Sequence, residues 1–521
     1  MKLANYVSGE WKHGTGEEHT LLDPVTGEQL ATVSSTGIDL AAALDYARTK
    51  GTAGLQQLAY AQRADLLGKI ADVLSANRDQ YFEISLKNLG ATQADASFDV
   101  DGAIYTLKTY AKLGKPLEGT IVLDGAAIPL SKTGVFQGQH FLKPLSGAAV
   151  LINAFNFPAW GLWEKAAPAL LSGVAIVVKP ATATAWLTQR MVEDVIKAGI
   201  LPDGALSILC GSARALLNHV SENDVILFTG SAGTAHSIRT NDNVVAKSTR
   251  LNVEADSLNA TILGHDAPGT QPFDLLVKEV VREMTLKAGQ KCTAIRRILA
   301  PRETAQSLAD AIAAKLATVK VGNPRNSEVK CGPLVNKAQQ KVALESLAQL
   351  QREAKIVFGG GFDFEPIDAD AKVSCFVQPT LLFCNKPMQS KAVNEIEVFG
   401  PVATILPYDS DNEAIELARR GGGSLVASIF SDDKEFQRLI TIGIAGWHGR
   451  IMVVDTQVDG QHTGHGNVMP SCLHGGPGRA GGGEELAGLR ALQLYHRRFV
   501  VQGPPELMAA IATDSIDASA L

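Results

Sequence analysis

The stretch GAAVLINAFNFPAWGLWEKAAPALLSGVAIVVKP, residues 147–180, contains the clearest structural pattern of the chain. A short apolar run (147–153) precedes a run with helical spacing (160–171), and a second short apolar run (175–180) follows. Strand, helix and strand at this spacing are typical of parallel strands joined by a crossover helix. The stretch therefore predicts one β-α-β unit of an α/β protein.

The same alternation continues to residue 253. TQRMVEDVIKAG (188–199) has helical spacing, and LSIL (206–209), VILFTGS (225–231) and VVAKSTRLNV (244–253) supply further apolar runs. Such a series predicts a doubly wound, Rossmann-type parallel sheet, in which ligands bind at the carboxyl ends of the strands. No G-x-G-x-x-G follows the first strand, so the usual dinucleotide fingerprint is absent.

A second α/β region is expected from about residue 298 to 450, including DAIAAKLATVKVGNP (310–324) and the strand-like SLVASIF (424–430). Residues 459–483 are rich in glycine and histidine, which predicts loops with little core. The glycine stretch 421–423 has two interpretations, an opening for a long ligand or a solvated loop.

A predicted helix leads to a single cysteine. In residues 272–289, PFDLLVKEVVREMTLKAG, apolar residues recur at helical intervals, with Pro272 near the start and Gly289 as a stop. Cys292 follows directly after Lys291. A free cysteine is usually a small buried apolar residue, but an adjacent lysine can favour the thiolate of a catalytic nucleophile.

Composition excludes several classes of function. The 521 residues, 45% hydrophobic and 20% charged, suit a globular protein of two or three domains. The net charge of -6 is spread without long runs of one sign, which argues against nucleic acid or an anionic membrane as partner. The chain starts without a secretory signal pattern, and the six cysteines lack paired spacing. We therefore expect a cytoplasmic protein that binds neither nucleic acid nor membrane.

Ten motifs, in order along the chain, resemble those of the aldehyde dehydrogenase superfamily. They are DPVTGEQLATV (23–33), INAFNFP (152–158), EKAAPAL (164–170), VVKPAT (177–182), FTGS (228–231), NVEADS (252–257), GQKCTAIRR (289–297), VGNP with CGPLV (321–335), EVFGPV (397–402) and GGGEELAGL (481–489). Any one of them alone would be a weak signal, whereas a chance match of all ten in order is negligible.

The resemblance implies three structural parts. They are a Rossmann-type cofactor domain (1–120 and 146–254), an α/β catalytic domain (255–475), and a small β oligomerisation arm with the C-terminal segment (121–145 and 476–521). In relatives, the edge strands of this arm pair two subunits across a two-fold axis, so we expect a homodimer.

The resemblance also implies catalytic roles. Cys292 would attack an aldehyde carbonyl, Asn156 with the backbone N–H of Cys292 would hold the oxyanion, and Glu254 would activate the water that hydrolyses the resulting thioester. A general base of this kind is favoured by a somewhat raised pKa. Lys165 and Glu485 would connect Glu254 to solvent protons, and the alternative is an ordinary surface lysine and glutamate.

Two motifs depart from the superfamily pattern. Phe155 replaces the usual tryptophan before NFP, and Ala255-Asp256 replaces the usual glycine pair after the catalytic glutamate. Asp256 would raise the pKa of Glu254 by like-charge repulsion if their side chains approach.

The cofactor expected from the resemblance is a nicotinamide dinucleotide. In NAD-preferring relatives the second residue after the proline of the KP motif is acidic, whereas this chain has Thr182. A hydroxyl can donate to a 2′-phosphate that Lys179 neutralises, so we expect NADP, with NAD as the weaker alternative. The full set of expected cofactor contacts is Ala154, Phe155, Lys179, Thr182, Gly230, Ser231, Glu397 and Phe399.

Longer segments resemble one branch of the superfamily, whose members oxidise CoA-thioester semialdehydes in aerobic aromatic-acid degradation. They include KPATATAWLTQ (179–189), NVEADSLNA (252–260) and HGGPGRAGGGEELAGLRAL (474–492). The resemblance implies a CoA-thioester semialdehyde as substrate and a place in benzoate degradation. The alternatives are a general aldehyde dehydrogenase, a CoA-acylating one, against which Glu254 argues, and a catalytically silent binding or structural member.

Three histidines, His462, His465 and His474, lie in the glycine-rich segment. Their spacing is not a helical ligand pair, no matching cysteine or carboxylate set is evident, and the implied chemistry needs no metal. We expect structural loop histidines, with substrate contacts as the alternative and no metal site.

Overall fold

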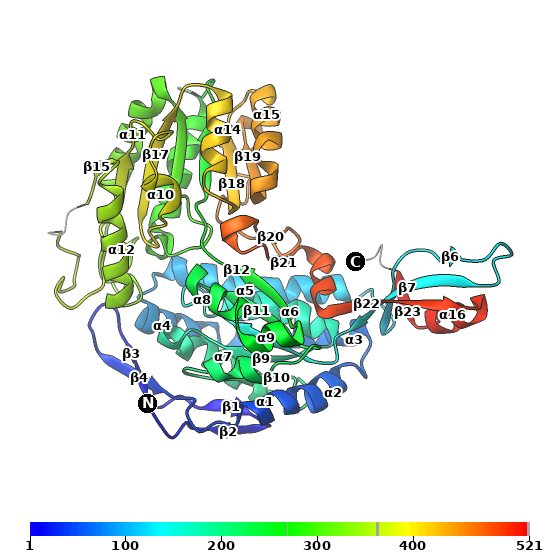
Figure 1. Ribbon diagram of the computed structural model, residues 1–521. Coiled ribbons are helices and arrows are strands. Elements are labelled where there is room, and N and C mark those ends of the chain that lie inside the picture. Colours follow the sequence, from blue (N-terminus) through cyan, green and yellow to red (C-terminus); the bar gives the residue numbers. More distant parts are fainter. Residues whose placement is uncertain (268, 361–363, 518–521) are drawn as a thin grey trace.

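The computed structural model describes residues 1–267, 269–360 and 364–517, which form two α/β lobes and a projecting β arm (Figure 1). The predicted α/β class with a Rossmann-type parallel sheet is confirmed. The division into 1–120 with 146–254, 255–475, and 121–145 with 476–521 stays a prediction, and its last residues, 518–521, lie outside the described residues.

The first lobe is built on a seven-stranded sheet in the order β12-β11-β8-β9-β10-β1-β2. Its strands are β12 (Arg250–Glu254), β11 (Val225–Thr229), β8 (Ala148–Ile152), β9 (Ala175–Lys179), β10 (Leu206–Ile208), β1 (Asn5–Val7) and β2 (Glu10–Lys12). The first five are parallel, and β1 and β2 add antiparallel pairings at one edge. The register pairs Thr229 with Glu254 and Ile152 with Lys179, so these carboxyl ends share one edge of the sheet.

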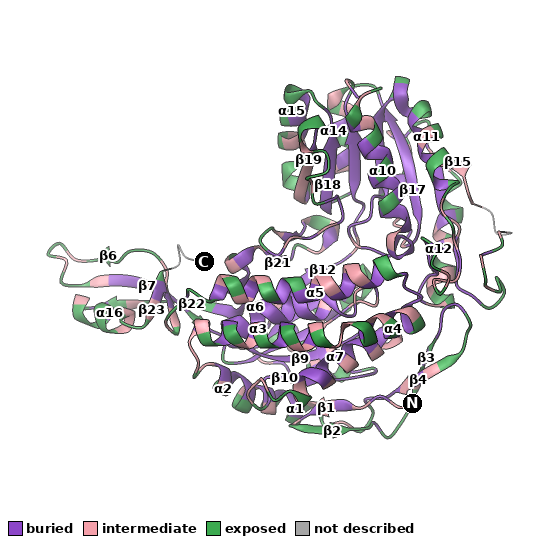
Figure 2. Cartoon of the chain, turned by 180° about the vertical axis from the view of Figure 1, so that it is seen from behind, coloured by how far each residue is buried: buried purple, intermediate pink, exposed green. Residues whose placement is uncertain are grey.

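Helices cover both faces of this sheet, which is why its central strands are buried and almost entirely apolar (Figure 2). The helices of the lobe are α1 (Leu40–Tyr46), α2 (Ala53–Leu55), α3 (Tyr60–Ala76), α4 (Arg78–Leu89), α5 (Gln93–Gly114), α6 (Trp160–Ser172), α7 (Ala185–Lys197), α8 (Ala232–Arg239) and α9 (Asp242–Lys247). The helices predicted at 160–171 and 188–199 correspond to α6 and α7, and the run 244–253 is divided between α9 and β12.

The second lobe carries another seven-stranded sheet, in the order β15-β16-β17-β14-β13-β18-β19. Its strands are β15 (Lys355–Phe358), β16 (Thr380–Phe383), β17 (Val402–Tyr408), β14 (Arg297–Pro301), β13 (Ala260–Leu263), β18 (Ser424–Phe430) and β19 (His448–Val454), all parallel except β15. Its helices are α10 (Gln271–Thr285), α11 (Arg302–Leu316), α12 (Lys337–Leu350), α13 (Ala392–Glu395), α14 (Asp411–Arg419) and α15 (Lys434–Ile444). Two separate apolar clusters form its core.

The projecting arm pairs two segments that are distant in the sequence (Figure 1). Strands β22 (His496–Gly503), β7 (Gln137–Pro144), β5 (Ile121–Leu123) and β23 (Ser515–Asp517) lie in that order, with β6 (Ile128–Pro129) on β7 and α16 (Pro505–Ala512) packed beside them. The remaining strands form two small sheets, β3 (His19–Leu22) with β4 (Gln29–Val33), and β20 (His474–Gly475) with β21 (Glu484–Leu486).

The helix before Cys292 ends earlier than predicted. Helix α10 stops at Thr285, and the 3₁₀ turn Leu286–Gly289 follows, in which Lys287 and Ala288 adopt left-handed backbone angles (φ 54° and 51°). A helix cannot continue through two left-handed residues, so Gly289 is the last residue of this turn rather than the stop of the helix.

No helix in the described parts of the chain is long and apolar enough to cross a membrane.

Candidate active site

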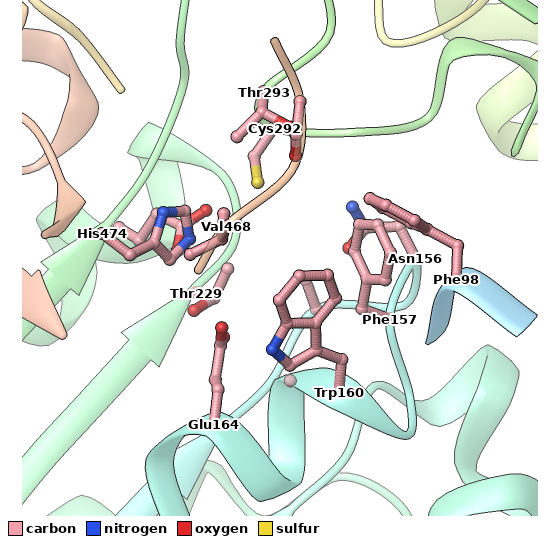
Figure 3. A pocket seen from close by; sticks show the side chains of 14 residues that line it. Phe98, Asn156, Phe157, Trp160, Glu164, Thr229, Cys292, Thr293, Val468 and His474 are labelled. Carbon is pink, nitrogen blue, oxygen red and sulfur yellow. Dashed lines mark hydrogen bonds and ion pairs between the residues drawn. The ribbon is translucent and has the colours of Figure 1, made fainter. Parts of the chain in front are cut away.

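The predicted nucleophile and general base line one pocket where the carboxyl edge of the first sheet faces the second lobe (Figure 3). The pocket is lined by Phe98, Ala154, Asn156, Phe157, Trp160, Gly161, Glu164, Thr229, Glu254, Cys292, Thr293, Gly466, Val468 and His474. Segments from six different parts of the chain therefore meet here. In Figure 3 the aromatic side chains of Phe98 and Phe157 lie on one side of the pocket, and His474 and Val468 lie on the other.

The loop that carries Cys292 is held in one conformation by several buried contacts. The backbone N–H of Lys287 donates to Asp95 at 2.6 Å, which stabilises the left-handed turn. Nδ2 of Asn259 donates to the carbonyl oxygens of Cys292 (2.7 Å) and Ala294 (2.9 Å). A Cβ at Gly289 would lie 2.2 Å from the carbonyl oxygen of Gly400, so only glycine fits there. The sulfur of Cys292 points into the pocket (Figure 3).

The Cys292 thiol is protonated in this environment. Burial raises its pKa well above the ordinary value, and the nearby Glu254 carboxylate raises it further. The expectation that Lys291 favours a thiolate is wrong, because its ammonium group is buried and paired with Glu283 at 2.6 Å. A base must therefore accept the thiol proton before the sulfur can attack.

Two donors lie beside Cys292 where an oxyanion would form. Asn156 is buried at the edge of the pocket, and its Nδ2 donates one hydrogen bond, 3.0 Å, to the carbonyl oxygen of Gln290. The second N–H of this amide remains for a ligand. Within the described residues, no acceptor is paired with the backbone N–H of Cys292. This arrangement suits the predicted oxyanion hole.

Glu254 is kept ionised by His474, a partner that the motifs did not predict. Its Oε2 lies 3.0 Å from Nε2 of His474, and both side chains are almost fully buried. Burial alone would raise the pKa of Glu254, but His474 outweighs it and lowers the pKa to about 2. The expectation that Asp256 raises this pKa is wrong, because Oδ1 of Asp256 accepts a hydrogen bond from the backbone N–H of Ala232 at 3.1 Å and its repulsion acts on Glu397.

Lys165 and Glu485 are buried behind Glu254, so the alternative of ordinary surface residues is wrong. Nζ of Lys165 lies 2.7 Å from Oε1 of Glu164 and 3.1 Å from Oε2 of Glu485. Burial alone would lower the pKa of Lys165, but these carboxylates outweigh it and raise the pKa. Burial raises the pKa of Glu485 to about 8, so this carboxyl holds a proton at neutral pH. Glu164, which the motifs did not single out, belongs to the same cluster.

The predicted cofactor contacts lie at the carboxyl edge of the first sheet. Lys179, half-buried, ends β9, and no carboxylate in the described parts of the chain is paired with its ammonium. Thr182 opens the 3₁₀ turn Thr182–Thr184, and Ser231 caps the N-terminus of α8 by accepting from the backbone N–H of Thr234. Gly230 ties β11 to β12 by donating to the carbonyl oxygen of Glu254 at 3.1 Å. An unpaired lysine beside a helix N-terminus fits a dinucleotide phosphate.

The remaining predicted cofactor residues lie nearer the pocket. Oε2 of Glu397 accepts from the backbone N–H of Ser257 at 3.2 Å, and its Oε1 lies 3.5 Å from Nε of Arg296 in an ion pair. Burial raises the pKa of Glu397 to about 7. The rings of Phe155 and Phe399 meet edge to face at 5.7 Å, and Ala154 lines the pocket. A carboxylate oxygen with this one long contact can still accept from a ribose hydroxyl.

The three loop histidines have different environments. His474 lines the pocket beside Glu254 and Cys292, a carboxylate and a cysteine that the sequence spacing did not place near it. His465 is buried, its Nδ1 lies 2.8 Å from Oγ of Ser428, and burial lowers its pKa well below the usual value. The segment 459–483 therefore contributes buried side chains, in contrast to the prediction of loops with little core.

In the glycine stretch 421–423, Gly421 and Gly423 are buried and Gly422 is exposed. A Cβ at Gly421 would lie 2.2 Å from the Arg297 guanidinium, and one at Gly423 would lie 2.0 Å from the carbonyl oxygen of Pro477. The glycines are required because two segments of backbone pack closely here.

The sequence profile of the aldehyde dehydrogenase family matches residues 11–465, so the chain belongs to this family of oxidoreductases that act on aldehydes. The family uses a nicotinamide cofactor, NAD or NADP. The chain is 63% identical, over 92% of its length and 93% of the relative's, to a 3,4-dehydroadipyl-CoA semialdehyde dehydrogenase of Aromatoleum evansii. It is also 42% identical to Protein MaoC of Klebsiella aerogenes, over 34% of the chain and 52% of that protein.

Solved structures of this family share the fold. Betaine aldehyde dehydrogenase from Staphylococcus aureus, in complex with NAD+, superimposes with a TM-score of 0.83 over 96% of this chain and 94% of that chain, at 24% identity.

Proposed function

We propose that this protein oxidises 3,4-dehydroadipyl-CoA semialdehyde, a CoA-thioester semialdehyde, to the carboxylic acid, with NADP as the preferred cofactor and in aerobic benzoate degradation. The convergence of Cys292, Glu254 and Asn156 in one buried pocket is the observation that carries the reaction type. The substrate is supported by the 63% identity over nearly the whole chain to the relative of that name.

The residues divide the chemistry between them. Glu254 accepts the thiol proton of Cys292, and the sulfur then bonds to the aldehyde carbon while Asn156 and the Cys292 N–H hold the oxyanion. The cofactor, when bound, supplies the acceptor for the hydride of the aldehyde carbon. The oxidised carbon remains on Cys292 as a thioester. Glu254 then takes a proton from the water that attacks this thioester, which releases the acid and restores the thiol.

Protons leave Glu254 through the buried cluster behind it. Carboxylate oxygens of Glu164, Glu254 and Glu485 lie within 4.8 Å of one another. Lys165 bridges Glu164 and Glu485, so a proton can pass between neighbouring groups by small side-chain movements. This cluster would serve the role first assigned to Lys165 and Glu485 alone.

Three groups support NADP. Thr182 offers a hydroxyl where a carboxylate would repel a 2′-phosphate, and Lys179 is a half-buried ammonium without a carboxylate partner in the described residues. Arg214, which the motifs did not single out, lies near enough to lower the pKa of Lys179 further. Two cations beside one hydroxyl suit a dianionic phosphate better than a ribose hydroxyl. The nicotinamide ribose would be held by Glu397.

Two alternative functions are less well supported. A CoA-acylating dehydrogenase transfers the thioester to free CoA and has no need of a general base, whereas Glu254 lies ionised beside Cys292. A catalytically silent member would not need Cys292, Asn156 and Glu254 to share one pocket.

The substrate is tested by comparing kcat/KM for 3,4-dehydroadipyl-CoA semialdehyde with that for an aliphatic aldehyde of similar length, with NADP. We expect a preference for the CoA substrate of at least about tenfold, which corresponds to about 1.4 kcal/mol. Equal use of the two aldehydes would contradict the CoA assignment and leave a general aldehyde dehydrogenase. Absence of NADPH formation with both would contradict the reaction itself.

We also propose that the protein acts in the cytoplasm as a homodimer. Strand β22 is the outer strand of the arm sheet, and Val500 and Phe499 on it are exposed. An apolar edge strand of this kind is usually covered by a partner, here a second copy of the chain.

A further inference from the structure

His474 touches the general base at the reacting end. Its Nε2 lies 3.0 Å from Oε2 of Glu254, with 5% of the His474 side chain and 1% of the Glu254 side chain exposed. The sulfur of Cys292 and one atom of each of these two side chains all lie within 4.8 Å of one another. In the described parts of the chain, His474 is the one cationic group at ion-pair distance from Glu254.

The pocket contains more carboxyl groups than its lysine can balance. Glu164 and Glu485 share Lys165, which leaves Glu254 dependent on His474. A buried carboxylate without a partner, close to two others, takes up a proton at neutral pH. With His474 charged and Glu485 protonated, the cluster becomes neutral overall and Glu254 remains ionised.

The backbone holds His474 in place. Strand β20 pairs with β21, which sets His474 opposite Leu486 and next to Glu485 of the same small sheet. A Cβ at Gly475 would lie 1.9 Å from the carbonyl oxygen of Gly483, and one at Gly449 would lie 1.9 Å from that of Gly475. The imidazole is therefore presented to Glu254 from a closely packed segment with little freedom to turn away.

We propose that His474 is a positioning residue for Glu254: its imidazolium keeps the carboxylate ionised and turned towards Cys292 while water attacks the thioester. The inference deepens the proposed function and rests on it. The titratable groups that face the pair are Glu164 and Lys165 from α6, Glu485 from β21 and Cys292 from the loop after α10.

The charges of the pair define a pH window. Burial alone would lower the pKa of His474, but Glu254 outweighs it and raises the pKa to about 9. His474 is thus charged at neutral pH, and the ion pair is lost as the pH rises through 9. Glu254, with its pKa lowered to about 2, is ionised throughout the neutral range as long as this pair exists.

Replacing His474 tests the inference. His474→Phe keeps the bulk and removes the charge, His474→Gln keeps a neutral donor, and His462→Phe in the same segment, outside the pocket, is the matched control. The NADPH burst and the steady-state rate are measured from pH 6 to 10 with a simple aliphatic aldehyde. We expect both His474 variants to form one equivalent of NADPH in a burst slower than that of wild type, because Glu254 also accepts the thiol proton, and turnover at pH 7 to fall about 10- to 100-fold, within the range of general-base effects.

The pH profile separates this role from a merely structural one. Turnover by both His474 variants should recover as the pH rises, because Glu254 without its cation has a raised pKa, whereas wild-type and His462→Phe turnover should show no such rise between pH 6 and 9, where His474 is charged. If His474→Phe does not fold, the comparison of the His474→Gln and wild-type pH profiles still tests the inference. Wild-type rates and an unchanged profile in the variants would overturn the inference. A wild-type protein without a burst on any aldehyde would overturn the function and this inference together.

Discussion

The protonated Cys292 thiol makes the site dependent on its neighbours. Burial and the Glu254 carboxylate raise the pKa of this thiol, and the adjacent Lys291 is turned away to Glu283. The nucleophile is therefore formed by proton transfer from the Cys292 thiol to Glu254 and is assisted by the oxyanion donors. A thiolate is not present before the substrate binds.

Asn156→Ala tests the oxyanion donor. The substitution removes an N–H that faces the developing oxyanion, so we expect the burst rate to fall about 100- to 1000-fold, with a lower thermal midpoint because the buried hydrogen bond to Gln290 is also lost. Rapid-mixing measurements of NADPH with a saturating aldehyde provide the check, and Asn467→Ala in the nearby loop is the control. A burst rate within threefold of wild type would remove Asn156 from this role.

Thr182→Glu tests the cofactor preference. A carboxylate at this position repels a 2′-phosphate and accepts from ribose hydroxyls, so the ratio of kcat/KM for NADP to that for NAD should fall by at least about tenfold, or 1.4 kcal/mol. Thr182→Ser keeps the hydroxyl and should keep the wild-type ratio. An unchanged ratio in Thr182→Glu would show that the 2′-phosphate binds elsewhere.

The motifs predicted catalytic residues that lie within distinctive local sequence. They could not predict which side chains from distant segments contact those residues in the folded protein. Cys292, Glu254 and Asn156 were named from their motifs, and the structure brings them together. The orientation of Lys291 and the approach of His474 and Glu164 to Glu254 depend on tertiary packing. The one available signal for His474 was its place just before the motif that contains Glu485.

The turn between α10 and Cys292 is the element on which the geometry of the nucleophile depends. Lys287 and Ala288 are left-handed, and such residues are strained by about 1–3 kcal/mol each. Propensity alone predicted a continuing helix here, because the contacts that stabilise the turn come from Asp95 and Gly400, far away in the sequence. The strands and helices between 147 and 253 were predictable because their burial pattern repeats locally.

Gly289→Ala should disturb this turn. Gly289 has a φ of 68°, and a Cβ there would lie 2.2 Å from the carbonyl oxygen of Gly400, so we expect a loss of at least about 1 kcal/mol in the free energy of unfolding. The burst rate should fall as well. Gly446→Ala, with open space around the added Cβ, is the control and should stay within about 0.5 kcal/mol of wild type. Denaturant unfolding gives both values, and equal stability of the two variants would contradict the account of the turn.

The lobes and the arm have separate tasks in the whole molecule. The pocket lies where both lobes meet, so its residues come from segments as distant in the sequence as Phe98 and His474. The arm lies apart from the pocket and exposes apolar side chains on its outer strand. A sequence pattern can predict the two lobes. It cannot predict the pocket, because the pocket forms only where the folded lobes meet.

Val500→Asp tests the dimer. Val500 is 47% exposed on β22, so a carboxylate there would be buried against the partner and should convert dimer to monomer at micromolar concentration. Ile442→Asp on α15, 70% exposed, is a matched control away from the arm and should leave the dimer intact. Light scattering reports the mass of each variant. A Val500→Asp protein that remains dimeric would place the interface elsewhere.

The most direct test asks whether Cys292 forms the thioester and Glu254 is needed to hydrolyse it. Glu254→Gln is mixed with 3,4-dehydroadipyl-CoA semialdehyde and NADP, the reaction is quenched in acid, and the protein is analysed by mass spectrometry. We predict a first turnover that is slower than in wild type, because Glu254 no longer accepts the thiol proton, and that stops at one equivalent of NADPH per active site with an acyl adduct on the peptide that contains Cys292. Steady turnover of the variant without an adduct would contradict the account, because another group would then activate the water.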